Sequence, residues 1–265
     1  MDNEHPIIDV RDLVFAYGDN VVLDRVSFSV KPGEIFVILG GSGSGKTTLL
    51  RNLVGLLHPA SGSIVIGGED FTAMSEEART EARRKMGMCF QAAALLGSLT
   101  VADNVALPLR EHTKLEESTI DIMTRIKLEL VGLGGAGDLL PSELSGGMRK
   151  RAGIARAMAM DPEIIFYDEP SAGLDPIVAA GLDQLIRTMQ STFNLTSIVV
   201  THEMESVRII ADSICVLHRG RVAGIGTFDE LAKSDHPYIQ QFFARQPDDA
   251  GATDEAYARS LTGID

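Results

Sequence analysis

One short glycine-rich stretch constrains this chain more than any other feature. Residues 40–48 read Gly-Gly-Ser-Gly-Ser-Gly-Lys-Thr-Thr and match the pattern G-x-x-x-x-G-K-[ST] at every fixed position. Before the stretch, Glu34 to Leu39 is a short apolar run rich in β-branched residues, as in a buried strand. After it, apolar residues recur at helical spacing from Thr47 to Leu57. A strand, a glycine loop and a helix in this order predict a phosphate-binding loop.

The chemistry of the loop follows from its residue types. The glycines let successive backbone N–H groups turn inward on an anion, and the helix start adds the positive end of its dipole. The Lys46 ammonium is expected to reach the β- and γ-phosphates of a nucleotide, and the Thr47 hydroxyl to bind Mg²⁺. The alternative is a glycine-rich turn that binds nothing. By chance alone, the four fixed positions occur in about one of every hundred chains of this length. The expected nucleotide contacts are Gly40, Gly41, Ser42, Gly43, Ser44, Gly45, Lys46, Thr47 and Thr48.

Composition narrows the class of protein. The chain has 265 residues, 45% of them hydrophobic, which suffices for a large core in one α/β domain. No apolar run approaches the ~20 residues that span a bilayer, and residues 1–6 do not resemble a signal peptide, so we expect a soluble, cytosolic chain. The net charge of −13 argues against a nucleic-acid partner. Cys89 and Cys215 lie in apolar strand-like runs and are expected to be reduced core residues.

The region before the loop has strand character. Asp9 to Phe15 and Val26 to Val30 are separated by a turn at residues 18–20, and Ser61 to Gly68 looks like a further strand after the first helix. Tyr17 stands just before the turn. Its ring could stack on an adenine, although an ordinary half-buried tyrosine gives the same pattern.

From Ala92 to about Met160 the pattern becomes helical, which predicts a helical subdomain inserted in the sheet domain. Val101 to Leu109 and Glu117 to Val131 have helical character, and residues 132–137 form a glycine-rich link. The sequence Ser145-Gly146-Gly147 then opens a basic helix. A serine and two glycines at a helix start can bind an anion, although Ser-Gly-Gly is also a common loop.

Three strand-like runs end in polar side chains. They end at Gln91, at Asp168 with Glu169, and at His202. The phosphate loop also follows a strand, so these side chains are expected near the γ-phosphate, at the carboxyl edge of one sheet. Asp168 is suited to hold Mg²⁺ through water, and Glu169 to orient or deprotonate an attacking water. Each of them, taken alone, also fits a solvated strand end.

The last part of the chain predicts short elements and a tail. Ser213 to Leu217 and Val222 to Ile225 suggest a hairpin, and helices are expected to begin at Phe228 and Pro237. Residues 247–265 are acidic, and we expect them to be mobile or ordered only against a partner.

This set of motifs, in this order and spacing, resembles the ATP-binding cassette (ABC) ATPases from about Ile7 to Phe243. The resemblance implies an α/β P-loop NTPase fold with a parallel-sheet core, an antiparallel β subdomain and the helical subdomain at about 92–160, all in a single domain over residues 1–246. It also implies ATP and Mg²⁺ as ligands. In that family the Walker A loop maps onto Gly40 to Thr47, the Walker B strand onto Ile164 to Glu169, the adenine-stacking aromatic onto Tyr17, the Q-loop onto Gln91, the D-loop onto Ser171 to Asp175 and the switch histidine onto His202.

The same resemblance implies which residues act. Catalysis would involve Lys46, Gln91, Glu169 and His202, and the metal ion would contact Thr47, Gln91 and Asp168. Two chains would sandwich two ATP molecules head to tail, because Ser145, Gly146 and Gly147 of such ATPases bind the γ-phosphate held by the other subunit. Met148 stands where the commonest motif has glutamine, so one side-chain hydrogen bond to the nucleotide is lost while the backbone donors remain.

A narrower resemblance rests on Phe90 to Leu96, Asp103 to Thr113 and Pro141 to Met148. These segments look like the ATPase subunit of Mla-type transporters, which are associated with MCE proteins and move phospholipid between the membranes of Gram-negative bacteria, maintaining outer-membrane lipid asymmetry. Members of that group sit on the cytoplasmic face of the inner membrane against a permease pair that contacts the groove beside Gln91. An MCE-domain ring and often a small STAS-domain protein complete the assembly.

The sequence itself contains no lipid contact, so the substrate class depends on the resemblance. An ABC ATPase for a polar solute, such as an amino acid, is one alternative. A non-transport ABC regulator or nucleic-acid-processing cassette is another, and the acidic charge and the single cassette argue against it.

Overall fold

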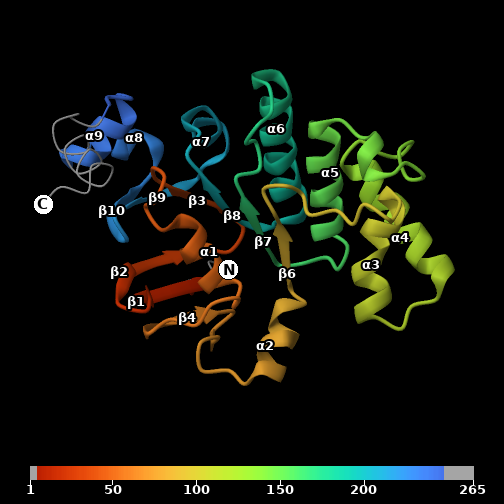
Figure 1. The fold of residues 1–265 in the computed structure, drawn as a ribbon, viewed down its shortest axis with the longest axis horizontal. Helices are drawn as coiled ribbons and strands as arrows, with labels where there is room; N and C mark the ends of the chain where they lie inside the picture. The colour runs from red at the N-terminus through yellow and green to blue at the C-terminus, as the bar shows by residue number, and fades with distance from the viewer. Residues whose placement is uncertain (1–4, 248–265) are drawn as a thin grey trace, which may run out of the picture.

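The computed structural model describes residues 5–247, which form two sheets with helices around them (Figure 1). Five strands of the larger sheet run parallel in the order β9-β3-β8-β7-β6, and β10 extends it antiparallel beside β9. Their bounds are β3 Ile35–Leu39, β6 Met86–Cys89, β7 Ile164–Asp168, β8 Thr196–Thr201, β9 Ser213–His218 and β10 Arg221–Gly226. The expected α/β fold with a parallel-sheet core is confirmed.

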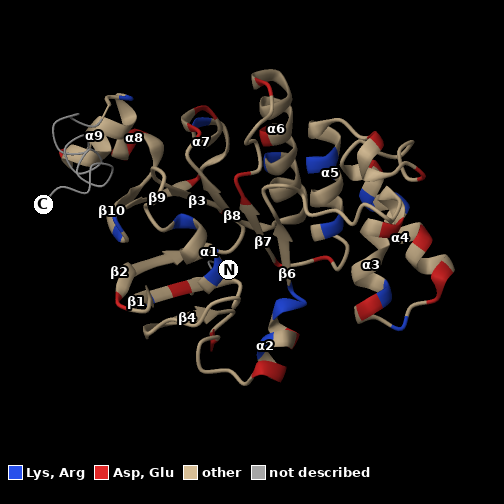
Figure 2. Ribbon diagram, in the orientation of Figure 1, with Lys and Arg blue, Asp and Glu red and all other residues tan. Residues whose placement is uncertain are grey.

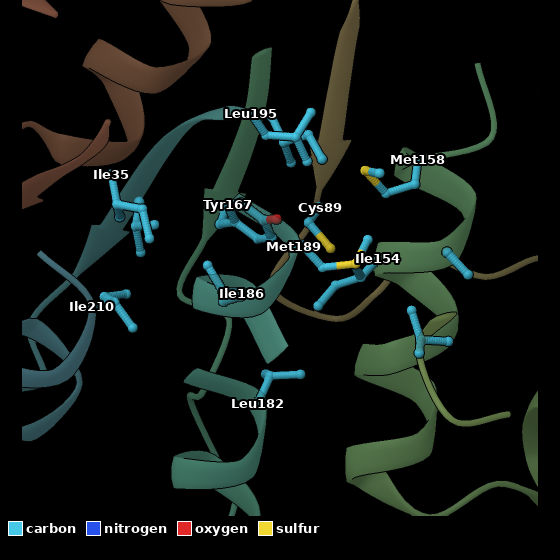
Figure 3. Packing of buried hydrophobic residues seen from close by; sticks show 14 of the residues in the cluster. Ile35, Cys89, Ile154, Met158, Tyr167, Leu182, Ile186, Met189, Leu195 and Ile210 are labelled. Atoms are coloured by element: carbon cyan, nitrogen blue, oxygen red, sulfur yellow. The ribbon is translucent and has the colours of Figure 1, made fainter. Parts of the chain in front are cut away.

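The inner strands of the larger sheet, β3, β7, β8 and β9, are buried on both faces, which explains why they are largely apolar. Successive residues of β3 alternate between two clusters, with Val37 in one and Ile38 in the other. Figure 3 shows part of the first cluster, where Tyr167 of β7 lies beside Met189 of α6 (Pro176–Phe193) and Ile154 of α5 (Gly146–Ala157). Helices α5 and α6 therefore cover the face of the larger sheet to which Tyr167 points.

The smaller sheet is the expected antiparallel one. It consists of β1 (Ile8–Tyr17), β2 (Asn20–Val30), β4 (Ser61–Ile66) and β5 (Glu69–Asp70), in the order β2-β1-β4-β5. Its apolar residues share the second cluster with the larger sheet and with α1 (Lys46–Leu53). Phe28 of β2 stacks on Phe36 of β3 with 5.1 Å between ring centroids. This packing fixes the small sheet against the strand that carries the phosphate loop.

Residues 90–163 hold helices and turns and no strand. In Figure 1, α3 (Val101–His112) and α4 (Glu117–Leu130) lie with α5 at one end of the molecule, and the short 3₁₀ turn Pro141–Glu143 precedes α5. Alanines and aliphatic residues of these helices form a small cluster around Leu109 and Ile120. The division into a domain over 1–246 with a subdomain at about 92–160 stays a prediction.

Several elements differ from the sequence-based expectations. α1 ends at Leu53 rather than near Leu57, because Gly55 takes a left-handed φ of 73° and breaks the helical path. Two short helices, α2 (Glu76–Arg83) and α7 (Met204–Ile210), were not anticipated. The last helices, α8 (Phe228–Leu231) and α9 (Pro237–Phe243), begin at the expected residues.

Three further sequence-based expectations concern membrane-spanning helices, the two cysteines and the acidic end of the chain. In the part that the structure describes, no helix has the length and apolar character to cross a membrane. Cys89 and Cys215 are buried free thiols, as expected, and burial raises the pKa of each to about 12. The acidic segment predicted to be mobile or partner-bound lies outside the described residues, apart from Pro247.

Candidate active site

The site lies at the carboxyl edge of the larger sheet, where four neighbouring parallel strands end. Leu39 of β3 pairs with Thr201 of β8, and Val200 of β8 pairs with Asp168 of β7. The segments that follow these strands therefore start side by side. They are the loop at residues 40–48 after β3, His202 after β8, Glu169 after β7 and Gln91 after β6.

The glycine loop forms a shallow cradle of about 190 Å³, lined by Val22 and residues 43–48. Gly43 and Gly45 have φ values of 74° and 102°, in the left-handed region that favours glycine. Gly40 packs so closely on β9 that a Cβ there would lie 2.3 Å from the Leu217 carbonyl oxygen. The backbone path of the cradle thus depends on glycine both for conformation and for space.

Lys46 places a buried cation in the loop. Its Nζ donates hydrogen bonds to the carbonyl oxygens of Gly40 at 2.7 Å and Gly41 at 3.0 Å. Burial lowers the pKa of the Lys46 ammonium, and the nearby carboxylates of Glu169 and Asp168 oppose that shift. The lysine and the two acids therefore interact electrostatically within one site.

Residues that are distant in sequence also form hydrogen bonds with the loop. The N–H of Gly41 donates to the Tyr238 hydroxyl of α9 at 3.1 Å, and the N–H of Gly220 donates to the Ser44 carbonyl at 3.0 Å. The Tyr238 ring stacks on His218, with centroids 3.7 Å apart. The sequence pattern gave no signal for Tyr238, because its contact spans 197 residues.

The two adjacent acids after β7 have different surroundings. Asp168 is half-buried, and burial followed by the charge of Glu169 raises the pKa of its carboxyl, while Arg51, Lys46 and Lys150 oppose the shift. Glu169 has a left-handed φ of 47°, which is uncommon for a residue other than glycine. Its N–H donates to Val200 O at 2.9 Å, and its carboxylate lies 2.9 Å from the ring of His202.

Helix α5 contributes two basic residues that sequence reasoning missed. Lys150 Nζ donates to the carbonyl oxygen of Glu169 at 3.1 Å. Arg156 donates to the carbonyl oxygens of Ala93 at 2.9 Å and Ala94 at 2.7 Å, just after Gln91. Gln91 itself is exposed. The only signal for these contacts was the basic character of the helix, which does not reveal the acceptors.

Two predicted binding elements lie outside the cradle lining. Ser145 caps α5 by accepting a hydrogen bond from the Met148 N–H at 3.2 Å, and it is exposed. Gly147 after it lies against Val178 at the start of α6, and not in the loop of the same chain. Tyr17 exposes half of its surface at the end of β1, on the hairpin whose Val22 lines the cradle. Neither Ser145 nor Tyr17 lines the cradle of the same chain.

The residues near the cradle suit a magnesium ion bound with phosphate. The oxygen atoms of Thr47, Asp168 and Gln91 are the hard ligands that Mg²⁺ prefers. Within residues 5–247 no group of three or more His, Cys, Asp or Glu side chains could hold a metal ion. Mg²⁺ usually takes most of its ligands from water and substrate phosphate.

Comparison with known proteins gives consistent relatives. The family model described as ABC transporter matches residues 23–172. The intermembrane phospholipid transport system ATP-binding protein MlaF of Haemophilus influenzae is 44% identical over 242 residues, covering 91% of this chain and 92% of that protein. MlaF of Escherichia coli K12 is 42% identical over 236 residues, covering 89% and 88%. The probable ribonucleotide transport ATP-binding protein mkl of Mycobacterium leprae is 43% identical over 235 residues, covering 89% and 68%.

Solved structures give the same family. The cassette MJ0796, as a dimer in a post-hydrolysis state with ADP and Pi, superimposes with a TM-score of 0.76 at 29% identity, covering 83% of this chain and 98% of that chain. The cbiO1 protein of Clostridium perfringens, part of the transporter complex cbiONQ, superimposes with a TM-score of 0.81 at 29% identity, covering 98% and 100%. Together with the phosphate loop and the strand-end acids, these relatives show that the chain is an ATPase of the ABC transporter family.

Proposed function

We propose that this chain is the ATP-hydrolysing subunit of a phospholipid transporter of the Mla type. The observation that carries the proposal is the identity of 42–44% to two MlaF proteins along 88–92% of their lengths. Three sequence features also resemble that group. They are Met148 in place of the common glutamine and the segments Phe90 to Leu96 and Asp103 to Thr113. The chain would drive the movement of phospholipid between inner and outer membranes without contacting the lipid itself.

Nucleotide binding would use the cradle. ATP phosphates would accept hydrogen bonds from the loop amides of residues 40–48, and the Lys46 ammonium would leave its two loop carbonyls to contact the β- and γ-phosphates. The exposed ring of Tyr17 would stack on the adenine. Because the cradle is already formed by its glycines, little reorganisation would be needed on binding.

Hydrolysis would be carried out by Glu169 and His202. The Glu169 carboxylate would orient the attacking water and take its proton, and the His202 imidazole would orient that carboxylate and contact the γ-phosphate. Thr47, Asp168 and Gln91 would hold Mg²⁺, which neutralises part of the phosphate charge when bound. Most of the catalytic effect would come from positioning and electrostatics, as expected for phosphoryl transfer.

A homodimer would complete each site. Ser145, Gly146 and Gly147 do not line the cradle of their own chain, and they would contact the γ-phosphate held by the partner. Closure around two ATP molecules and reopening after hydrolysis would then drive the membrane subunits.

The membrane subunits would dock in a groove of about 500 Å³ beside the segment of Gln91. Its wall is apolar at Phe90, Leu107 and Pro108, and basic at Arg83 and Arg156. Such a surface suits a short helix of an inner-membrane permease with an apolar face and an acidic end. The chain would thus be peripheral on the cytoplasmic face of the inner membrane, with an MCE-domain protein and in some systems a STAS-domain protein in the assembly.

The proposal is tested by isolating the tagged full-length chain with its partners from native membranes. We expect a permease and an MCE-domain protein in the complex, and ATP-dependent transfer of labelled phospholipid after reconstitution in vesicles. A matched complex with Glu169→Gln should contain the same subunits and transfer no lipid. A complex with a soluble small-solute-binding protein, or with no lipid transfer despite ATP hydrolysis, would contradict the proposal.

A second candidate is a transporter of a polar solute. The identity of 43% to the mkl protein, described as a probable ribonucleotide transport ATP-binding protein, favours it. Stimulation of ATP hydrolysis by ribonucleotides in the reconstituted complex, with no response to phospholipid, would support this candidate instead. A non-transport regulator acting on nucleic acid would bind DNA at low salt, where charge attraction is strongest, and the charge of −13 disfavours it.

A further inference from the structure

We propose that Lys150 is a positioning residue that ties helix α5 to the catalytic Glu169 of the same chain. Lys150 follows Ser145 by five residues in the same helix, so α5 would carry one group for each of the two sites of a dimer. The inference rests on the proposed function, because the role of Glu169 as base and the role of Ser145 across the dimer are proposals.

Lys150 is one of four buried Lys and Arg side chains in residues 5–247, with 9% of its surface exposed. Its Nζ donates to the Glu169 carbonyl oxygen at 3.1 Å. Burial lowers the pKa of the Lys150 ammonium, and the carboxylates of Glu203, Glu169 and Asp168 oppose that shift. A buried ammonium is costly unless it is paired, so this contact indicates a specific task for the side chain.

The carbonyl that Lys150 holds belongs to a residue with an unfavourable backbone. Glu169 has a φ of 47°, and such a strained backbone conformation persists only where several surrounding contacts stabilise it. Four groups hold it: Val200 O accepts from its N–H, Lys150 Nζ and the Ala172 N–H donate to its carbonyl at 3.1 Å and 3.3 Å, and His202 contacts its carboxylate. Of these four, Lys150 is the one that comes from the helical region, and its bond to the carbonyl is the shorter of the two and carries a charge. Without it, the longer bond from the Ala172 N–H alone would hold this carbonyl, and the peptide after Glu169 could rotate and turn the carboxylate away from the water.

Helix α5 thereby joins two functions within one rigid element. Ser145 caps its start and would contact the nucleotide of the partner, while Lys150 lies about 7.5 Å further along the axis at 1.5 Å per residue. Figure 2 shows the basic segments of α5 between α6 and the pair α3 and α4. A shift of α5 on binding the partner's ATP would therefore also move the Glu169 carbonyl. Lys150 would couple nucleotide contact at one site to hydrolysis at the other.

The test is single-turnover hydrolysis of radiolabelled ATP by the full-length chain and its variants. Lys150→Met should lower the rate by about tenfold to a hundredfold, which is the cost of a small misplacement of a catalytic group. Its affinity for ATP should stay within about twofold of the parent. Lys150→Gln keeps an N–H donor and should recover most of the lost rate. Arg151→Met is the matched control, because Arg151 of the same helix donates to Val131 O at 2.9 Å instead.

A double variant separates positioning from a general effect. In the Glu169→Gln background, Lys150→Met should change the residual rate by less than about twofold, because Lys150 acts through Glu169. An equal loss in both backgrounds, an equal loss in Arg151→Met, or a parental rate in Lys150→Met would each overturn the inference. Loss of cooperative thermal unfolding in Lys150→Met would also overturn it, since the lysine would then support the whole fold. A parental rate in Glu169→Gln alone would instead refute the proposed catalytic base.

Discussion

The Nδ1 atom of His202 lies 2.9 Å from Oε1 of Glu169, although the two residues are 33 positions apart in the chain. They meet because β7 and β8 are parallel neighbours that end at the same edge of the sheet. The Glu169 side chain is 12% exposed and the His202 side chain 57% exposed. A mostly buried carboxylate thus contacts a ring that faces solvent, which would suit the general base and orienting partner proposed above.

The first prediction concerns this carboxylate. Glu169→Gln preserves size but removes the basic oxygen, so we expect ATP to bind while the hydrolysis rate falls by at least about a hundredfold. ATP should then accumulate a dimer, measurable by light scattering. Glu163→Gln is a suitable control, because Glu163 precedes the other end of β7 and pairs with Lys85 at the surface. Hydrolysis at the parental rate in the Glu169 variant would refute the assignment of the base.

The second prediction concerns the space beneath the phosphate loop. Gly40→Ala would place a Cβ 2.3 Å from the Leu217 carbonyl oxygen, which is backbone and cannot move aside cheaply. We expect a loss of stability of about 1–3 kcal/mol, as for other overpacked sites, together with weakened ATP binding. Gly97→Ala, where a Cβ would meet nothing within 4 Å, is the control for thermal unfolding and nucleotide titration. Equal stability of the two variants would contradict the close approach.

The third prediction concerns the dimer. Ser145→Arg would place a bulky side chain where the partner's nucleotide is proposed to lie, so ATP hydrolysis should be lost while the isolated chain still binds ATP. The substitution also removes a helix cap, which costs about 1 kcal/mol. Ser145→Asp separates the two effects, since aspartate caps equally well but repels phosphate. If either variant keeps full activity in a multiple-turnover assay, the shared site is wrong.

The sequence was sufficient for features that local chemistry dictates. The phosphate loop needs glycine at fixed spacing, and the strands before Glu169 and His202 are buried on both faces, so each leaves a local pattern in the sequence. Parallel strands with helical crossovers then place the strand ends together, which is why the edge that carries the site could be anticipated.

The contacts that support the site could not be predicted in the same way. Lys150 and Arg156 stand in a helix whose basic residues look alike in sequence, and only the tertiary packing selects the carbonyl that each one meets. Tyr238 reaches the loop from α9 across 197 residues. The short helices α2 and α7 have too few turns for a clear period, so their formation depends on packing more than on pattern.

The last prediction concerns a buried acid next to the D-loop. Asp183 of α6 is 1% exposed, and burial raises the pKa of its carboxyl above the usual value, while a hydrogen bond with Ser206 and the charge of Glu203 have smaller effects. Ser206 in turn lies 3.2 Å from Ser171 of the D-loop, oxygen to oxygen. Among the described residues, the Asp183 Oδ1 atom has no hydrogen-bond partner. The ionised carboxylate is therefore poorly compensated in the folded chain.

Asp183→Asn should stabilise the fold at pH 8, by about 1 kcal/mol or more for each unit of raised pKa. Because the folded pKa is raised, the parent is most stable below the unfolded pKa and loses stability as the pH rises through the folded pKa. The increase in the free energy of unfolding caused by Asp183→Asn should therefore be small near pH 4.5 and grow toward pH 8, as measured by urea denaturation. The exposed Asp235→Asn serves as control. A gain independent of pH, or a loss at pH 8, would mean that the Asp183 carboxylate is stabilised as an anion.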